Sequence, residues 1–296
     1  MLSADFKPTI LVTGANGQLA REINAIADHY TDYHFLFASR DDLPIENKEK
    51  VELFFEKHRI DYCINCAAYT AVDKAELESE KEKVFLINAY AVEGLAEICK
   101  FHKAKLIHIS TDYVYDGSNK LPLKETDAVG PVNVYGSSKL QGEELATQQN
   151  PATLIIRTSW VYSSFGNNFV KTMLRLFRER DEITVVADQY GCPTYAADLA
   201  KVIMSLIEKM KGGNDLSGIV NYCNEGITTW YEFAEEIKSL SNSNCKISPI
   251  PTSSYKTAAK RPLYSVLDTT KIKRTLGLQI PFWKDSLKKC MGHLVE

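Results

Sequence analysis

The sequence of 296 residues lacks long apolar runs: no stretch approaches the roughly 20 apolar residues that a membrane-spanning helix needs. The first eight residues also lack the apolar core of a signal peptide. An excess of one charge is missing too, because the sequence has 35 Lys and Arg residues and 38 Asp and Glu residues. It contains no long basic run. We therefore expect a cytoplasmic protein that binds neither nucleic acid nor a membrane surface.

A disulfide framework is also absent from the cysteine pattern. The seven cysteines are odd in number and scattered along the chain, which argues against such a framework. Cys63 and Cys66 have the spacing of a redox pair, but they lie inside an apolar, strand-like run without a turn between the thiols. We interpret them as buried small residues.

A glycine-containing turn follows the first apolar run. Thr9–Thr13 is short and β-branched, as strands of a buried parallel sheet are, and Gly14-Ala-Asn-Gly-Gln-Leu-Ala20 follows at once. Residues 19–29 then continue with helical spacing. Glycines at such a turn let the backbone approach a pyrophosphate, whose charge is favoured at the helix N-terminus. The pattern predicts a dinucleotide site, and a plain strand-to-helix turn is the alternative. The residues predicted to bind the dinucleotide are Gly14, Asn16, Gly17, Gln18 and Leu19.

The end of the second expected strand, Tyr33–Ala38, bears on the choice of cofactor. In this fold class that strand end meets the adenosine ribose. Ser39 and Arg40 follow it, ahead of Asp41 and Asp42. An acidic residue directly at the strand end would bind the free 2′-hydroxyl of NAD, whereas Ser39 and Arg40 can accommodate a 2′-phosphate. We predict NADPH as the cofactor, and the two aspartates keep NADH open.

Strands and helices alternate up to residue 162. We expect further strands at 61–66, 105–110 and 153–157, and helices at 48–57, 77–102 and 134–147. After the strand at 61–66, the residues Ala67, Ala68 and Tyr69 would let a nicotinamide cofactor pass close to the backbone. The alternation predicts an α/β fold, a Rossmann-like doubly wound parallel sheet.

The chain changes character after residue 162. Helices are expected at 169–179 and 196–211 and strands at 183–186 and 218–223, but irregular segments predominate from residue 226. We predict an NAD(P)-binding Rossmann domain at residues 7–162 plus 187–224. Residues 163–186 plus 225–296 are predicted to form a smaller, substrate-binding domain against the carboxyl edge of the sheet.

Tyr135 and Lys139 open the amphipathic run 134–147. In a helix they are separated by i, i+4 and lie on one face. A positive charge at about 4 Å would favour the tyrosinate by about 4 kcal/mol at an effective dielectric near 20, which lowers the tyrosine pKa by up to about three units. The pair therefore predicts a general acid or base, with an ordinary exposed helix pair as the alternative.

Thr111 lies just past the expected strand 105–110, where substrate groups collect in an open α/β sheet. Its hydroxyl can hydrogen-bond a substrate carbonyl while Tyr135 protonates it. Capping of a turn is the alternative role for this threonine.

The three motifs 14–20, 110–115 and 135–139 together resemble those of the extended short-chain dehydrogenase/reductases. More closely, five further segments resemble the dTDP-4-dehydrorhamnose reductase family: 67–76, 157–162, 166–169, 188–194 and 261–262. The resemblance implies a nucleotide-sugar substrate and reduction of the 4-keto group of dTDP-4-dehydro-L-rhamnose to dTDP-L-rhamnose. It also implies that the smaller domain binds the nucleotide sugar.

The resemblance assigns roles to individual residues. Thr111, Tyr135 and Lys139 match the family's catalytic set. Tyr135 would give a proton to O4, Lys139 would hold the nicotinamide ribose and lower the pKa of Tyr135, and Thr111 would orient the carbonyl. Positions that match the family's substrate pocket are Val72, Asp112, Tyr113 and Trp160, to which we add Arg261 of the Arg261-Pro262 match.

Two departures from the family bear on the cofactor. Leu43-Pro44-Ile45 stands where the family often has an acidic residue near the adenosine, and the end of the second strand varies in the family, so NADPH and NADH both stay open. Some members bind Mg²⁺ at a dimer contact, but no ligand cluster supports a metal here, so no metal-ligating residue is assigned and a homodimer stays open. The alternative functions are a nucleotide-sugar epimerase or dehydratase that retains NAD, and a non-enzymatic, cofactor-binding regulatory subunit like that of methionine adenosyltransferase.

Overall fold

A computed structural model describes residues 7–118 and 120–295 of the chain. The expectation that the chain starts without a signal peptide falls mainly on residues 1–6, which lie outside the described residues. Among the described helices, none combines the length and the apolar character that crossing a bilayer takes.

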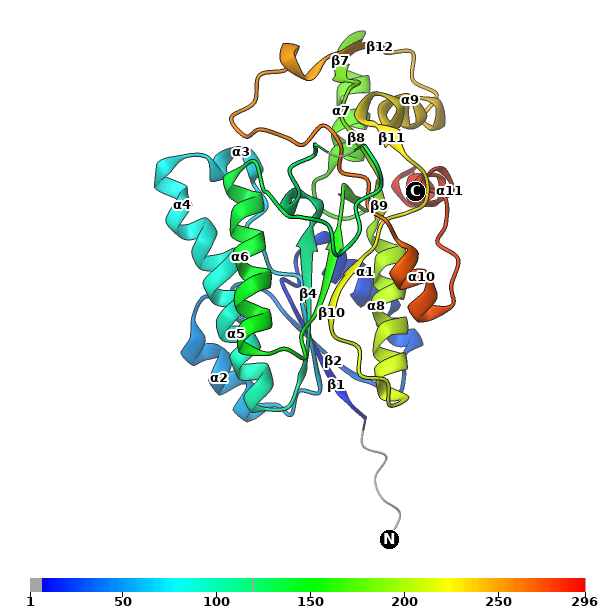
Figure 1. Cartoon of the computed structure of the whole chain (residues 1–296). Coiled ribbons are helices and arrows are strands. Elements are labelled where there is room, and N and C mark those ends of the chain that lie inside the picture. The colour runs from blue at the N-terminus through cyan, green and yellow to red at the C-terminus, as the bar shows by residue number, and fades with distance from the viewer. Residues whose placement is uncertain (1–6, 119, 296) are drawn as a thin grey trace.

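A six-stranded parallel sheet forms the centre of the molecule (Figure 1). Its strands are β1 (Thr9–Thr13), β2 (His34–Ala38), β3 (Tyr62–Asn65), β4 (Lys105–Thr111), β5 (Leu154–Thr158) and β10 (Gly218–Asn221). They lie in the order β10-β5-β4-β3-β1-β2, so the chain leaves β1 first toward one edge and then toward the other. This order confirms the predicted Rossmann-like, doubly wound sheet.

Helices cover both faces of the sheet and bury two separate cores. On one face lie α1 (Gln18–Ile26) and α8 (Ala196–Lys211), and on the other α2 (Lys48–Lys57), α5 (Ala91–Phe101) and α6 (Val134–Gln149). Successive residues of β1 alternate between the cores, with Ile10 and Val12 in the first and Leu11 in the second. The short apolar strand predicted at the start of the chain is therefore buried on both sides.

The helix expected at 77–102 is interrupted in the structure. It consists of α4 (Glu78–Phe85), a π-helical turn η2 (Leu86–Tyr90) and α5. Within that turn, the buried Asn88 side chain accepts from the backbone N–H of Tyr69 and donates to the Tyr69 carbonyl. It also donates to Ser138 Oγ at 3.0 Å. These tertiary bonds account for the extra residue in the turn, a feature that the apolar spacing does not reveal.

A further group of elements lies beyond the carboxyl ends of the central strands (Figure 1) and encloses a third apolar core. It is built from α7 (Phe169–Glu179), β7 (Glu182–Val186), α9 (Trp230–Leu240), β12 (Lys246–Ile250) and α11 (Trp283–Val295). In contrast, Ile272 of α10 (Thr270–Leu276) packs into the core beside α8. The division into a Rossmann domain and a smaller domain at the boundaries given above stays a prediction.

The remaining elements are short and connect these layers. They are η1 (Ala27–His29), α3 (Val72–Ala75), η3 (Asp112–Val114), β6 (Val161–Tyr162), β8 (Tyr190–Gly191), β9 (Thr194–Tyr195), β11 (Thr228–Thr229) and η4 (Thr252–Ser254).

Candidate active site

A cavity of about 610 Å³ opens at the carboxyl ends of β1, β3, β4 and β5. Most of the predicted site residues line it: Gly14, Asn16, Gly17, Gln18, Leu19, Arg40, Ala67, Ala68, Thr111, Asp112, Tyr135, Lys139 and Trp160. They come from segments far apart in the sequence. The parallel sheet brings them together because parallel strands end at one edge.

Five predicted site residues lie beside the cavity and are not among its lining residues. The hydroxyl of Ser39 donates to Asp42 at 2.6 Å, and the hydroxyl of Tyr69 donates to Glu80 at 2.9 Å. The ring of Tyr113 packs edge-on against Tyr135, with 5.9 Å between ring centroids.

Val72 and Arg261 are the other two residues outside the lining. Val72 begins the short helix α3, and Arg261 Nη2 donates to Asp73 Oδ2 of that helix at 2.6 Å. The Arg261–Asp73 pair thus ties a late segment of the chain to α3. Roles for Val72 and Arg261 in substrate binding stay predictions.

Several lining residues were missed by the sequence reasoning. They are Leu43, Ile45, Glu46, Cys66, Thr70, Ile87, Ile109, Ser110, Thr158, Val161, Gly166 and Asn167. Six of them lie in segments that carry the family resemblance: Thr70, Ser110, Thr158, Val161, Gly166 and Asn167. Leu43 and Ile45 lie where the chain departs from the family. The apolar members have no chemical signature, so only their position in the fold identifies them.

The turn after β1 has the geometry of a phosphate cradle. Gly14 has a left-handed φ of 66°, and a Cβ there would lie 2.8 Å from Ala67 N. Gly17 caps α1 without a side-chain hydrogen bond, so the first N–H groups of the helix face the cavity region free of a competing side chain. Close backbone approach and a helix N-terminus suit an anionic pyrophosphate, so these residues fit a dinucleotide.

Arg40 lies at the adenosine end expected for such a dinucleotide. Its Nη2 donates to Glu46 Oε1 at 2.6 Å, and its side chain is 61% exposed. Glu46 follows the Leu43–Ile45 segment and supplies the one acidic side chain that the structure shows bonded to Arg40. Arg40 can therefore reach a ligand phosphate only in competition with Glu46.

Thr111, Asp112 and Tyr135 gather around one point of the cavity. Thr111 Oγ1 donates to Asp112 Oδ1 at 3.1 Å. Burial raises the pKa of Asp112 to about 7, which the hydroxyls of Ser265 and Thr111 only partly offset. Burial also raises the pKa of Tyr135 to about 12; the Thr111 hydroxyl lowers it and the Asp112 carboxyl raises it further. Tyr135 accordingly keeps its proton at neutral pH.

This result differs from the sequence-based expectation that Lys139 lowers the pKa of Tyr135. Lys139 is only 1% exposed, and its Nζ lies against β4. Its Nζ donates to the Ile109 carbonyl at 2.7 Å and lies 3.1 Å from His108 Nε2. Burial lowers the pKa of Lys139 itself to about 8, although Glu143 and Cys66 oppose the change. Desolvation is thus the largest cause of both pKa shifts, and neither side chain is among the groups that shift the pKa of the other.

Two glycines allow the helix that carries Tyr135 and Lys139 to pack closely against its neighbours. A Cβ on Gly136 would lie 2.2 Å from the Tyr113 carbonyl oxygen, and one on Gly142 would lie 2.1 Å from the Asn88 carbonyl oxygen. Asn133 caps the helix by accepting from Gly136 N at 2.7 Å. Close packing against η3 and η2 therefore fixes α6, and with it the positions of both side chains.

Trp160 forms an apolar wall of the cavity. Its φ of 46° is left-handed, which is uncommon for an aromatic residue. The ring stacks on Trp230 with 3.6 Å between centroids, and a Cβ on Gly191 would lie 2.5 Å from the Trp160 ring. Gly191 and Trp230 therefore hold the tryptophan in this unusual backbone conformation.

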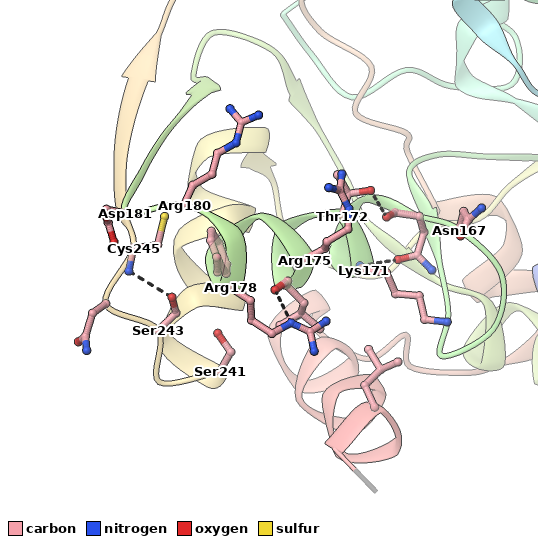
Figure 2. Close-up of a pocket in the computed structure, with 15 residues that line it drawn as sticks. Asn167, Lys171, Thr172, Arg175, Arg178, Arg180, Asp181, Ser241, Ser243 and Cys245 are labelled. Carbon is pink, nitrogen blue, oxygen red and sulfur yellow. Dashed lines mark hydrogen bonds between the residues drawn. The ribbon is translucent and has the colours of Figure 1, made fainter.

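A larger hollow of about 1240 Å³ lies against the outer face of α7, and Figure 2 shows its lining. Lys171, Arg175 and Arg178 of α7 line it, together with residues just before and after α7, residues that follow α9, and Leu294 of α11. None of the residues assigned from the sequence is in its lining. Size alone does not mark the reactive site, because the smaller cavity holds the convergent Thr111, Tyr135 and Lys139.

Among the described residues, no group of three or more His, Cys, Asp or Glu side chains is arranged to hold a metal ion. The seven cysteines are all unpaired, and Cys63 and Cys66 form no disulfide. Cys63 is buried, as interpreted, whereas Cys66 is only partly buried and lines the cavity.

Comparison with known proteins gives a consistent result. The family model described as RmlD substrate binding domain matches residues 8–296. A dTDP-4-dehydrorhamnose reductase from Aggregatibacter actinomycetemcomitans is 41% identical, over 96% of this chain and 98% of the relative.

Solved structures agree with the sequence matches. A dTDP-4-dehydrorhamnose reductase from Clostridium acetobutylicum is 40% identical with a TM-score of 0.92, covering 97% of this chain and 100% of that one. The enzyme of the same name from Bacillus anthracis, in complex with NADP, is 37% identical with a TM-score of 0.91, covering 97% and 99%. The chain therefore belongs to the dTDP-4-dehydrorhamnose reductase family.

Proposed function

We propose that this protein reduces the 4-keto group of dTDP-4-dehydro-L-rhamnose to give dTDP-L-rhamnose, with NADPH as the reductant. The observation that carries the proposal is the convergence of Thr111, Tyr135 and Lys139 on one cavity with the Gly14–Leu19 turn. The family membership, which extends over nearly the whole chain, supports the choice of sugar nucleotide.

The chain's residues divide the work of such a reduction. The turn from Gly14 to Leu19 would hold the cofactor's pyrophosphate, and Arg40 its adenosine end. A bound reduced nicotinamide supplies the hydride. Tyr135 donates a proton to the developing alkoxide at O4, since its raised pKa keeps it protonated at neutral pH. Thr111, whose hydroxyl donates to Asp112 in the structure, would turn that hydrogen toward the carbonyl and orient it.

The pocket walls would orient the sugar. Trp160 offers an apolar face that suits a deoxysugar, and Asp112 offers a buried carboxyl group beside Thr111. We propose that Val72, Tyr113 and Arg261, which are not among the lining residues of the cavity, also contact the sugar nucleotide. We propose that residues 163–186 plus 225–296 hold the nucleotide part.

We also propose a cytoplasmic location, which the seven unpaired cysteines support because a reducing compartment keeps thiols free. A homodimer and a bound Mg²⁺ are not part of the proposal, since neither has support in the described residues.

Cofactor stoichiometry tests the proposed reaction. Supplied with dTDP-4-dehydro-L-rhamnose, the purified protein should oxidise one NADPH per sugar, and deuterium from labelled NADPH should appear at C4 in the configuration of L-rhamnose. Absorbance at the nicotinamide band and NMR of the product provide the measurements. An epimerase would purify with NAD bound and consume no reductant. A regulatory relative would bind cofactor without sugar-dependent oxidation. Either result would reject the reductase.

Arg40→Ala is expected to reduce the preference for NADPH over NADH by about tenfold. Charge-assisted bonds to a 2′-phosphate contribute about 1.5–3 kcal/mol, and the Glu46 pair offsets part of this. Dissociation constants of both reduced cofactors, measured by fluorescence titration, provide the test. Arg175→Ala is the matched control, because Arg175 forms an exposed pair with Glu179 on α7. An unchanged NADPH/NADH ratio in Arg40→Ala would show that Arg40 does not contact the phosphate.

A further inference from the structure

A chain of four buried polar side chains runs through the sheet to Lys139. Thr13 on β1, Asn65 on β3, His108 on β4 and Lys139 on α6 are each at most 1% exposed. Thr13 Oγ1 donates to Asn65 Oδ1 at 2.7 Å, Asn65 Nδ2 lies 3.0 Å from His108 Nδ1, and His108 Nε2 lies 3.1 Å from Lys139 Nζ. Thr13, Asn65 and His108 are buried and only Lys139 borders the cavity, so each proton on the first three side chains must have an acceptor inside the protein.

The backbone fixes which way the Asn65 amide faces. The N–H of Ala67 can only donate, and it lies 3.2 Å from Asn65 Oδ1. The oxygen is therefore on that side, where it also accepts from Thr13. The Asn65 NH₂ group consequently faces His108, and His108 Nδ1 accepts from it without carrying a proton. A neutral imidazole whose Nδ1 is an acceptor carries its proton on Nε2.

The Nε2 proton of His108 determines what Lys139 can do. An ammonium group has three donors and no acceptor, so it would oppose the Nε2–H group at a separation of 3.1 Å. A neutral amine has a lone pair that accepts from Nε2–H. It still donates one hydrogen to the Ile109 carbonyl at 2.7 Å and has a second hydrogen left for the cavity.

We propose that the Ala67–Asn65–His108 chain holds His108 as the Nε2–H tautomer, so that His108 donates to Lys139 and stabilises it as a neutral amine. His108 is then a positioning residue that sets how strongly Lys139 holds its proton. Protonation of Lys139 requires one bond of the chain to be lost. Lys139 therefore holds a proton less tightly than a lysine whose ammonium group is fully paired.

The surrounding charges are compatible with this assignment. Burial lowers the pKa values of both His108 and Lys139. Two ionisable groups raise the pKa of Lys139 and so oppose the effect of burial: Glu143, on the same helix, and Cys66, just after β3. Glu143 is bonded to Arg157 through both carboxylate oxygens, which leaves it less able to compensate a charge on Lys139.

The role of Lys139 in reduction rests on the proposed function, whereas the tautomer of His108 does not. The test therefore uses the protein without nucleotide. In the protein labelled with ¹⁵N-histidine, the six histidines give separate ring signals, and His108 is identified by its loss in His108→Gln. We expect the shifts of a neutral ring with a protonated Nε2. A protonated Nδ1 or an imidazolium in the wild type would overturn the proposal.

Asn65→Asp reverses the proton order, because a carboxylate accepts where the amide NH₂ donated. His108 should then carry its proton on Nδ1. Thr13→Val is the matched control: it removes a hydrogen bond to the same amide, but Ala67 N–H still fixes the orientation of Asn65, so Nε2–H should persist. An Asn65→Asp variant that keeps the Nε2–H tautomer would contradict the proposed chain.

The proton affinity of Lys139 gives a second readout. Asn65→Leu removes the donor to Nδ1 without adding charge, which frees the ring to accept from a lysine ammonium. Two opposed donors are then replaced by one unpaired Nδ1–H, so the pKa of Lys139 should rise by about one unit. Titration of ¹³C-labelled lysine, with the signal assigned through Lys139→Met, measures it. An unchanged Lys139 pKa in Asn65→Leu would overturn the role of His108. If the Asn65 variants do not fold, the tautomer of His108 measured in the wild-type protein decides whether the proposal holds.

Discussion

Replacement of Tyr135 by Phe is expected to lower turnover by about 10² to 10⁴-fold, because it removes the proton donor in the reaction and little else. The ring packs edge-on against Tyr113, and that contact needs no hydroxyl. The pKa of about 12 keeps the wild-type phenol protonated, so the hydroxyl has a proton to give across the neutral range. Turnover at saturating NADPH and sugar nucleotide measures the loss, and NADPH affinity should stay within about twofold.

Tyr162→Phe is a suitable control for that variant. The Tyr162 hydroxyl is buried in the third core without a hydrogen-bond partner among the described side chains, away from the cavity. Its removal should leave turnover unchanged. If Tyr135→Phe retained more than about a tenth of wild-type turnover, Tyr135 could not be the proton donor, whatever the fold and cofactor site.

Local sequence patterns were sufficient to predict the first strand, the glycine turn and several helices of this fold. The strand and glycine turn at 9–20 were predictable because a short β-branched run, two glycines and a following amphipathic stretch are each determined within a few residues. The helices at 48–57, 169–179 and 196–211 have the predicted boundaries in the structure. The carboxyl-edge location of Thr111 followed from the parallel sheet alone.

The direction of long side chains was not predictable in the same way. An i, i+4 spacing places Tyr135 and Lys139 on one face of a helix, but it does not say where the lysine nitrogen ends. That nitrogen reaches β4 because the Ile109 carbonyl and His108 offer partners there, and those partners are about 30 residues distant in sequence. The expected depression of the Tyr135 pKa was wrong for this reason.

The buried partner of Arg157 was equally hidden. In the sequence, Arg157 ends an apolar strand and Glu143 lies in the middle of a helix, so neither residue indicates the other. In the structure they form a pair with both side chains 3% exposed. Contacts between different elements, such as this pair and the Asn88 bonds that produce the π-helical turn, require the tertiary arrangement and cannot be read from a local window.

Breaking the Arg157–Glu143 pair should cause the largest loss of stability among the side chains around the site. Arg157 Nη2 donates to Glu143 Oε2 at 2.6 Å, Nε donates to both carboxylate oxygens, and Nη1 donates to the Tyr115 hydroxyl at 2.8 Å. Arg157→Met keeps the apolar bulk but leaves the Glu143 carboxylate buried without its cation. An uncompensated buried charge of this kind costs about 3–5 kcal/mol, which chemical denaturation would measure as a lower free energy of unfolding.

The matched variants separate loss of the pair from loss of the arginine. Arg157→Met combined with Glu143→Leu removes both charges, and it should recover most of the stability, since a well-packed apolar pair replaces a buried ion pair at little cost. Arg175→Met breaks the exposed Arg175–Glu179 pair on α7 and should change stability by less than about 0.5 kcal/mol. A single Arg157→Met variant as stable as Arg175→Met would mean that Glu143 is neutralised by other groups. The double variant would then show no recovery, and Glu143 would no longer act as a fixed charge four residues from Lys139.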